Sequence, residues 1–424
     1  SAPALARRGF LRDGVFSPDV RLSSEEGADT VLEKRSVVDS DWLPGTVAAT
    51  YGTTDVAQIA VKEHLAHHSA GAGAGLHPRF LPAGLPLVQQ KLSTTEDDLT
   101  VRISGPVALD LDPVKAWWAE WFGQTGWPTE DLYYGLIEKF VRHVFVADPA
   151  AFHAIQGKPA LFLANHQTAV ESLVFSIVAS ALIGTPTVTV AKVEHQHTWL
   201  GHLIRQGFAW PSAKDPEVIT YFDREDKASL MGVIGKLYAG MADGSKSAMV
   251  HVEGTRSFDC TAPVTIMTGK FIDLAIEAGV PIVPVRFSGG LPREPLEQRT
   301  EFPVGMGKQD VWFGRPIRPE SLKAMPYGER KKVVLAAMNN TGPSCADETP
   351  LAGDPAFAAR VAELVQSTGA SEEHAALLAL LQQNPAPSPG TARLLRGLVS
   401  SDELAGDDAE SAWLRVVAGW FGQA

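Results

Sequence analysis

The stretch that decides the fold is KPALFLANHQTAVESLVFSIVASALI, residues 158–183. The apolar run at 160–163 is typical of a buried strand, and it stops at the polar residues 165–167. Beyond them, apolar residues recur over 173–181 at the spacing of one helical face. We therefore expect His166 at a strand-to-helix turn, where α/β proteins place groups that face a ligand.

Glu171 lies five residues after His166, and the pair supports two interpretations. In one unbroken helix, five steps turn a side chain by about 500°, so the two groups would point roughly 140° apart. If the chain bends between them, Glu171 could hold His166 in the tautomer that accepts a proton, which makes His166 a general base. Alternatively, Thr168 and Glu171 have the spacing of a capping box, and the carboxylate would only close a helix N-terminus. This stretch alone leaves both interpretations open.

Length and composition fit a chain of two or three domains with a sizeable core, since 45% of its 424 residues are apolar. No run approaches 18 apolar residues and no apolar signal stretch opens the chain, so we expect a cytoplasmic protein. The start at Ser1 instead of Met suggests an excised fragment. With only Cys260 and Cys345, a disulfide framework is not expected. The net charge of −12 comes without the basic face that nucleic-acid binding requires.

We expect three regions along the chain: an N-terminal accessory or linker region at 1–112, a main domain at 113–345 and an acidic helical extension at 346–424. The apolar stripes of the extension could dock a partner or pack on the main domain, as such stripes usually do. Histidines gather at 64–68 and at 195–202. Neither group has the spacing or the further ligands of a metal site, so no metal or cofactor is expected.

Residues 113–146 carry two apolar stripes at helical spacing, separated by a break at 126–128. They predict a pair of amphipathic helices ahead of the His166 turn. Their aromatic residues could contact a lipid interface or an acyl chain, but core packing is the commoner role of such a stripe. The residues of the first stripe are Val114, Trp117, Trp118, Trp121 and Phe122, and those of the second are Tyr133, Leu136, Ile137, Phe140, Val141 and Val144.

A second polar turn is predicted in AMVHVEGTRS, residues 248–257. Gly254 permits a close approach of backbone to ligand, and Thr255 supplies a hydroxyl. Arg256 offers a planar fork of N–H donors that matches a phosphate. Glu253 could act as a second carboxylate or orient Arg256.

The alternation of strand, polar turn and helix continues on both sides of this block. Strands are predicted at 185–194, 218–222 and 282–287, and a helix at 271–279. This order predicts an α/β fold with a mixed, largely parallel central sheet flanked by helices and preceded by the amphipathic helix pair. Arg224 directly follows one of the strands, where a cation can meet an anionic ligand.

Five blocks, taken together and in order, resemble the glycerolipid acyltransferase family. They are NHQTAVES, AKVEHQHTWLG, YFDRED, HVEGTRS and GVPIVPV, and the later VWFGRPI is similar to the closing strand and turn of that family. The resemblance spans about 145–320. Because five ordered blocks are more specific than any one motif, the resemblance favours His166 as a base over a capping role for Glu171.

The resemblance also implies roles for individual residues. His166 matches the general base, and Glu171 stands where most members have Asp. Arg224 and the residues 253–256 match the motifs that bind a phosphorylated acceptor. The chain departs from the family at 251–252, where His-Val replaces the common Phe-Pro.

The implied activity is the transfer of a fatty acyl group from acyl-CoA or acyl carrier protein to a hydroxyl of glycerol-3-phosphate or lysophosphatidic acid, without a covalent intermediate. Such an enzyme of phospholipid synthesis would be cytoplasmic, with or without peripheral membrane contact. Two alternatives stay open: an acyl thioesterase that releases free fatty acid, and an inactive module that docks an acyl carrier protein. Residues 1–110 weakly resemble interdomain regions of polyketide and fatty-acid synthases, which would make other synthase domains the partners.

Overall fold

The structure is a computed structural model that describes residues 110–223 and 225–422. Closer to the N-terminus it describes only five short strands. The predicted histidine group at 64–68 and Arg224 therefore lie outside the described residues. The five strands are β1 (Val20–Ser24), β2 (Thr30–Lys34), β3 (Ala49–Thr50), β4 (Gln89–Ser93) and β5 (Thr100–Ser104).

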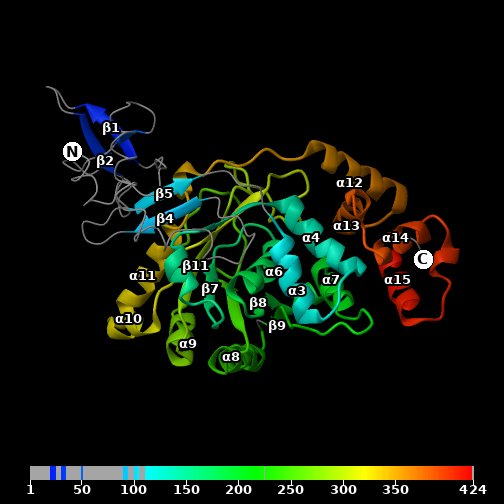
Figure 1. Cartoon of the computed structure of the whole chain (residues 1–424), viewed down its shortest axis with the longest axis horizontal. Helices are drawn as coiled ribbons and strands as arrows, with labels where there is room; N and C mark the ends of the chain where they lie inside the picture. Colours follow the sequence, from blue (N-terminus) through cyan, green and yellow to red (C-terminus); the bar gives the residue numbers. More distant parts are fainter. Residues whose placement is uncertain are drawn as a thin grey trace.

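A mixed sheet forms the centre of the molecule, with the described strands in the order β5-β4-β6-β12-β11-β7-β10-β8-β9 (Figure 1). The strands β11, β7, β10, β8 and β9 are parallel to one another, whereas β12 is antiparallel to β11. The predicted mixed, largely parallel sheet is confirmed. The remaining strands are β6 (Val141–Val146), β7 (Leu161–Ala164), β8 (Thr187–Lys192), β9 (Ile219–Phe222), β10 (Ser247–His251), β11 (Ile282–Ser288) and β12 (Gln309–Phe313).

Helices cover both faces of the sheet, and each face has its own hydrophobic core. Successive residues of a strand point to opposite faces. In β7, accordingly, Phe162 and Ala164 belong to one core and Leu161 and Leu163 to the other. The helices of the first face include α3 (Asp112–Phe122), α4 (Pro128–Phe140), α6 (Glu171–Ile183) and α7 (Trp199–Gly207), and those of the second are α8 (Lys227–Ala242), α9 (Lys270–Ala278), α10 (Pro319–Ala324) and α11 (Tyr327–Asn339).

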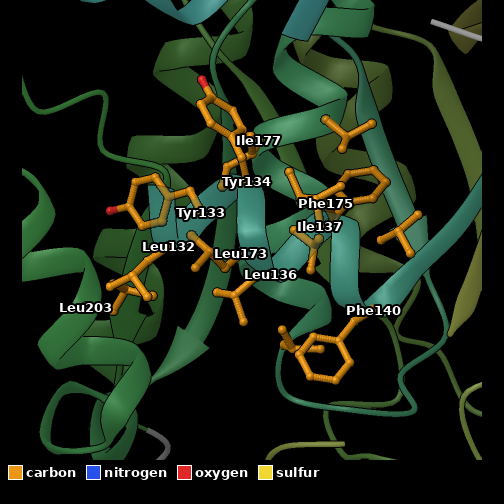
Figure 2. Packing of buried hydrophobic residues seen from close by; sticks show 14 of the residues in the cluster. Leu132, Tyr133, Tyr134, Leu136, Ile137, Phe140, Leu173, Phe175, Ile177 and Leu203 are labelled. Atoms are coloured by element: carbon orange, nitrogen blue, oxygen red, sulfur yellow. The ribbon is translucent and has the colours of Figure 1, made fainter. Parts of the chain in front are cut away.

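The predicted amphipathic helix pair is present as α3 and α4, and its apolar stripes pack into the first core. Figure 2 shows side chains of α4 gathered with Leu173 of α6 and Leu203 of α7. One part of the prediction is wrong: α4 ends at Phe140, and Val141 and Val144 belong to β6. Valine is branched at Cβ and favours extended backbone, which the helical spacing of these two residues concealed.

The C-terminal residues form four helices that also pack onto the first core. Trp413, Val417 and Phe421 are buried, and the Trp413 indole Nε1 donates to the Gln206 carbonyl at 2.6 Å. The apolar stripes predicted here therefore pack against the rest of the chain. In the described part of the chain no helix combines the length and apolar character needed to cross a membrane. The four helices are α12 (Pro355–Thr368), α13 (Glu372–Gln383), α14 (Pro389–Gly397) and α15 (Ala409–Trp420).

Candidate active site

The predicted bend between His166 and Glu171 is present, because β7 ends at Ala164 and α6 begins only at Glu171. The six residues between these elements form an irregular turn, which lets the two side chains meet. His166 Nδ1 lies 2.9 Å from Glu171 Oε2. The turn is fixed to the neighbouring strand β11 by Asn165, whose amide exchanges hydrogen bonds of 2.9 and 2.7 Å with the backbone of Phe287.

Glu171 is 1% exposed and is surrounded by hydrogen-bond donors. The backbone N–H groups of Gln167 and Thr168 donate to its carboxylate at 2.9 and 3.0 Å, and the side-chain amide of Gln309 donates at 2.6 Å. Val170 is the N-cap residue of α6, so Thr168 lies before the helix and is not the N-cap that a capping box requires. The predicted capping box is therefore absent, and the Glu171 carboxylate instead contacts the imidazole and the backbone of the turn that precedes α6.

A second layer of buried polar groups supports this carboxylate. The Gln309 amide also donates to Gln167 Oε1 at 3.2 Å, and Gln167 Nε2 donates to Glu348 Oε1 at 3.0 Å. Arg286 Nη2 donates to the other oxygen of Glu348 at 2.6 Å, in an ion pair whose side chains are 5% and 2% exposed. We call Glu171, Gln167, Gln309, Glu348 and Arg286 the buried network. Its last four members carry no signal in the local sequence, because their side-chain partners lie far away along the chain.

Burial governs the protonation of the pair. It lowers the pKa of His166 well below its usual value, with Arg256 and His195 adding to the effect. Burial also raises the pKa of Glu171 to about 7, against the lowering effect of His251 and of the hydrogen bonds from Gln309 and the backbone. His166 is therefore a neutral imidazole at neutral pH, which is the form that accepts a proton.

A second imidazole, His251 at the end of β10, stacks on His166 with ring centroids 3.6 Å apart and planes 17° apart. Its Nδ1 donates to the Asn165 carbonyl at 2.7 Å, and its Nε2 lies 3.3 Å from Ser172 Oγ. Burial, together with the neighbouring His166, lowers the pKa of His251 to about 3. The only sequence signal of this contact was the departure from the family at residue 251.

A cavity of about 480 Å³ opens at the carboxyl ends of the parallel strands, and His166 lies in its wall. Glu253, Gly254, Thr255 and Arg256 line the same cavity. The structure thus brings together five of the residues singled out from the sequence. Glu171 lies behind His166, and Arg224 is outside the described residues. Much of the remaining wall is apolar and includes Val190, Leu200, Phe222, Leu230, Val233, Ile234, Leu237, Val250 and Phe271.

The turn after β10 is fastened directly to the His166 turn, because the backbone N–H of Ser257 donates to the His166 carbonyl at 2.8 Å. Gly254 has a φ of +63°, a left-handed conformation that glycine adopts without strain. Glu253 is partly buried, and burial raises its pKa. The ion pair of Arg256 is not with Glu253 but with Glu301, from the segment between β11 and β12.

Three further cavity residues escaped the sequence analysis as site residues: Lys192, His195 and Arg299. Lys192 ends β8, and Arg299 belongs to the segment between β11 and β12. Lys192 and Arg299, together with Arg256, place positive charge on the polar side of the cavity, whereas burial lowers the pKa of His195 and keeps it neutral. Nothing in their local pattern distinguishes them from surface residues.

In the part of the chain that the structure describes, one group of side chains has the spacing of metal ligands: the ligand atoms of His166, Glu171 and His251 lie within 4.8 Å of one another. Both oxygens of Glu171 already accept hydrogen bonds, and His251 Nδ1 is bonded to a backbone carbonyl. Hydrogen bonds therefore explain why the three side chains lie together, and few of their lone pairs remain to bind an ion.

Comparison with known proteins finds a family match for the part of the chain that holds this site. Residues 143–288 match the family model described as Acyltransferase. No curated protein matches the chain. Among solved structures, the 1-acyl-sn-glycerophosphate (LPA) acyltransferase PlsC from Thermotoga maritima is similar with 20% identity and a TM-score of 0.34, over 50% of this chain and 77% of that one. The family match covers the blocks from His166 to β11 and confirms the predicted resemblance to an acyltransferase family over residues 143–288.

Proposed function

We propose that this domain transfers a fatty acyl group from a thioester donor, acyl-CoA or acyl carrier protein, to a hydroxyl of glycerol-3-phosphate or lysophosphatidic acid. One observation carries the proposal. His166 lies in the wall of a cationic and apolar cavity, while its Nδ1 is held 2.9 Å from a buried carboxylate. This contact leaves Nε2 as the ring nitrogen that can receive a proton.

His166 acts as general base in the proposed reaction. It takes the proton of the acceptor hydroxyl while that oxygen attacks the thioester carbonyl. A C–O bond forms, the C–S bond breaks, and the thiolate leaves and regains a proton from the imidazolium. Glu171 stabilises the imidazolium and holds Nδ1 protonated. General base catalysis of this kind contributes about 10²- to 10⁴-fold to the rate.

The cations of the cavity bind the phosphate of the acceptor. We assign this role to Arg256 and, following the family motif, to Arg224. Each charge-assisted hydrogen bond of this kind contributes about 1.5 to 3 kcal/mol. Thr255 and Gly254 lie beside Arg256 in the cavity wall, where a hydroxyl and an accessible backbone can complete the site.

The apolar wall receives the acyl chain. Val233 and Leu237 of α8 face the cavity together with Val190 of β8, and the volume of about 480 Å³ suits a flexible chain that must be withdrawn from water. Burial of each methylene contributes about 0.8 kcal/mol, so this side of the cavity favours long acyl groups over acetyl. Peripheral membrane contact and neighbouring synthase domains remain predictions from the sequence.

The test is an acceptor screen with the purified chain, both donor types and analysis by mass spectrometry. We expect an ester product that requires the phosphorylated acceptor, with one thiol released for each ester formed. Equal thiol release with and without acceptor would instead identify a thioesterase. Absence of turnover with every donor would favour the inactive docking module.

A further inference from the structure

Two of the described arginines, Arg256 and Arg299, line the cavity, and the structure holds them in different ways. Arg256 has a side chain that is 13% exposed, and its Nη2 donates to Glu301 in an ion pair. The carboxylate offsets much of the charge that Arg256 can present to a ligand, because opposite charges in contact cancel at longer range. An incoming phosphate must share this guanidinium with Glu301.

Arg299 is exposed and is held by contacts that leave its charge intact. Its Nε donates to the Arg256 carbonyl at 2.7 Å, and its guanidinium carbon lies 4.2 Å from the ring centroid of Phe258. Within the described residues, none of the ion pairs involves Arg299. The hydrogen bond through Nε and the aromatic contact orient the planar group, and the two Nη groups remain for a ligand.

The segment that carries Arg299 is fastened to the catalytic turn. The backbone N–H of Ala169, three residues after His166, donates to the Glu301 carbonyl at 3.2 Å. Arg299 is therefore fixed to both halves of the site, through Ala169 on one side and Arg256 on the other. A preoriented arginine loses little side-chain entropy when it binds an anion.

We propose that Arg299 is an anion-binding residue at the rim of the cavity and that it binds a phosphate ester of a substrate. This inference rests on the proposed function for the identity of its ligand. Two substrates carry such a group: the phosphorylated acceptor, and the phosphopantetheine arm that acyl-CoA shares with acyl carrier protein. Arg299 binds the phosphate of one of them with a planar pair of N–H groups.

The kinetic test compares Arg299→Met with Arg293→Met. Arg293 is an exposed arginine of the same segment, but it donates to the carbonyls of Glu348 and Ala346 and is not part of the cavity wall. We expect Arg299→Met to raise the KM of one substrate about 10- to 100-fold with kcat within about twofold, while Arg293→Met leaves both KM values near those of the parent. Arg299→Lys should recover part of the loss, since it restores charge but not the fork.

The two substrates separate the two sources of phosphate. A raised KM for glycerol-3-phosphate assigns Arg299 to the acceptor, and a raised KM for acyl-CoA assigns it to the donor. If neither KM rises more than in Arg293→Met, or if kcat falls while both KM values stay constant, the proposal is wrong.

Direct binding keeps this test independent of turnover. Calorimetric titrations of the parent chain and of Arg299→Met with glycerol-3-phosphate and with CoA measure the anion site itself. Weaker binding of either probe by Arg299→Met supports the site even if no ester forms, in which case only the proposed function fails. Equal binding by the two chains, or no binding by the parent, overturns the role of Arg299.

Discussion

The two sides of His166 differ sharply. Behind the ring, the buried network consists of groups that are hydrogen-bonded to one another, such as the Glu348–Arg286 pair with side chains 2% and 5% exposed. In front of the ring lies a cavity of about 480 Å³, where cations sit beside apolar walls. A closed polar network fixes geometry, whereas an open charged cavity binds ligands. Changes behind His166 should therefore alter kcat or stability, and changes in front of it should alter KM.

The largest effect is expected where the two sides meet, at His166 itself. His166→Ala removes the base, so we expect kcat to fall by about 10²- to 10⁴-fold while the chain remains folded. Steady-state kinetics and circular dichroism measure the two quantities. His197→Ala, which removes an exposed histidine after β8, serves as the control and should retain activity. Full activity of His166→Ala would show that His166 is not the base and that the two sides of its ring do not have these separate roles.

Behind the ring, Glu348→Ala should destabilise the protein strongly. It leaves Arg286 as a buried charge without its carboxylate partner, and breaking such a pair costs about 3 to 5 kcal/mol. Urea unfolding measures the change in the free energy of unfolding. The double variant Glu348→Met/Arg286→Met removes both charges and should recover most of the stability. A loss below about 1 kcal/mol in Glu348→Ala would mean that the network does not hold the turn.

In front of the ring, Arg256→Met should act on binding. We expect the KM of the phosphorylated acceptor to rise by about 10- to 100-fold with little change in kcat, because one charge-assisted contact is lost. Initial rates over a range of acceptor concentrations separate the two parameters. The exposed Arg315, paired with Asp148 away from the cavity, provides the control variant Arg315→Met. An unchanged KM with a reduced kcat would show that Arg256 positions the catalytic turn and does not bind the acceptor.

The smallest effect concerns His251 and depends on pH. Its pKa is lowered from 6.5 to about 3 in the folded chain, so the unfolded chain binds a proton between these values and the folded chain does not. Stability is therefore present above pH 6.5 and falls as the pH decreases. Between pH 8 and pH 5, the titration of His251 should lower the free energy of unfolding by about 2 kcal/mol. His251→Phe keeps a stacked ring and should lose less stability over this interval in urea unfolding; equal losses would contradict the account.

The sequence predicted the parts of this site that are local along the chain. The polar turns at His166 and at Glu253–Arg256 each follow a strand, and parallel strands bring such turns to one edge of the sheet. The buried network was invisible for a physical reason: Gln309 and Glu348 contact residues 138 and 181 positions away. No periodicity or local motif reports a contact of that kind.

Two further differences have equally specific causes. The sequence assigned Val141 and Val144 to a helix because their spacing continued the stripe of α4, but side-chain packing in the sheet decided otherwise. The sequence suggests Glu253 either as a second carboxylate or as the group that orients Arg256, whereas the structure pairs Arg256 with Glu301 from another segment. The spacing of Thr168 and Glu171 suggests a capping box, but α6 begins at Glu171, and its carboxylate contacts the His166 imidazole and the backbone of the preceding turn.

The most direct test of the central claim is the kcat of Glu171→Gln, measured beside its free energy of unfolding. A glutamine keeps an oxygen for the backbone N–H of Thr168, but its amide donates toward His166 Nδ1 and shifts the ring proton to Nε2, where the base must be free. The account predicts that kcat falls at least about 100-fold while the chain remains folded and the KM values stay near those of the parent. A kcat equal to that of the parent would show that Glu171 only fixes the turn before α6 and that His166 is not held as a base.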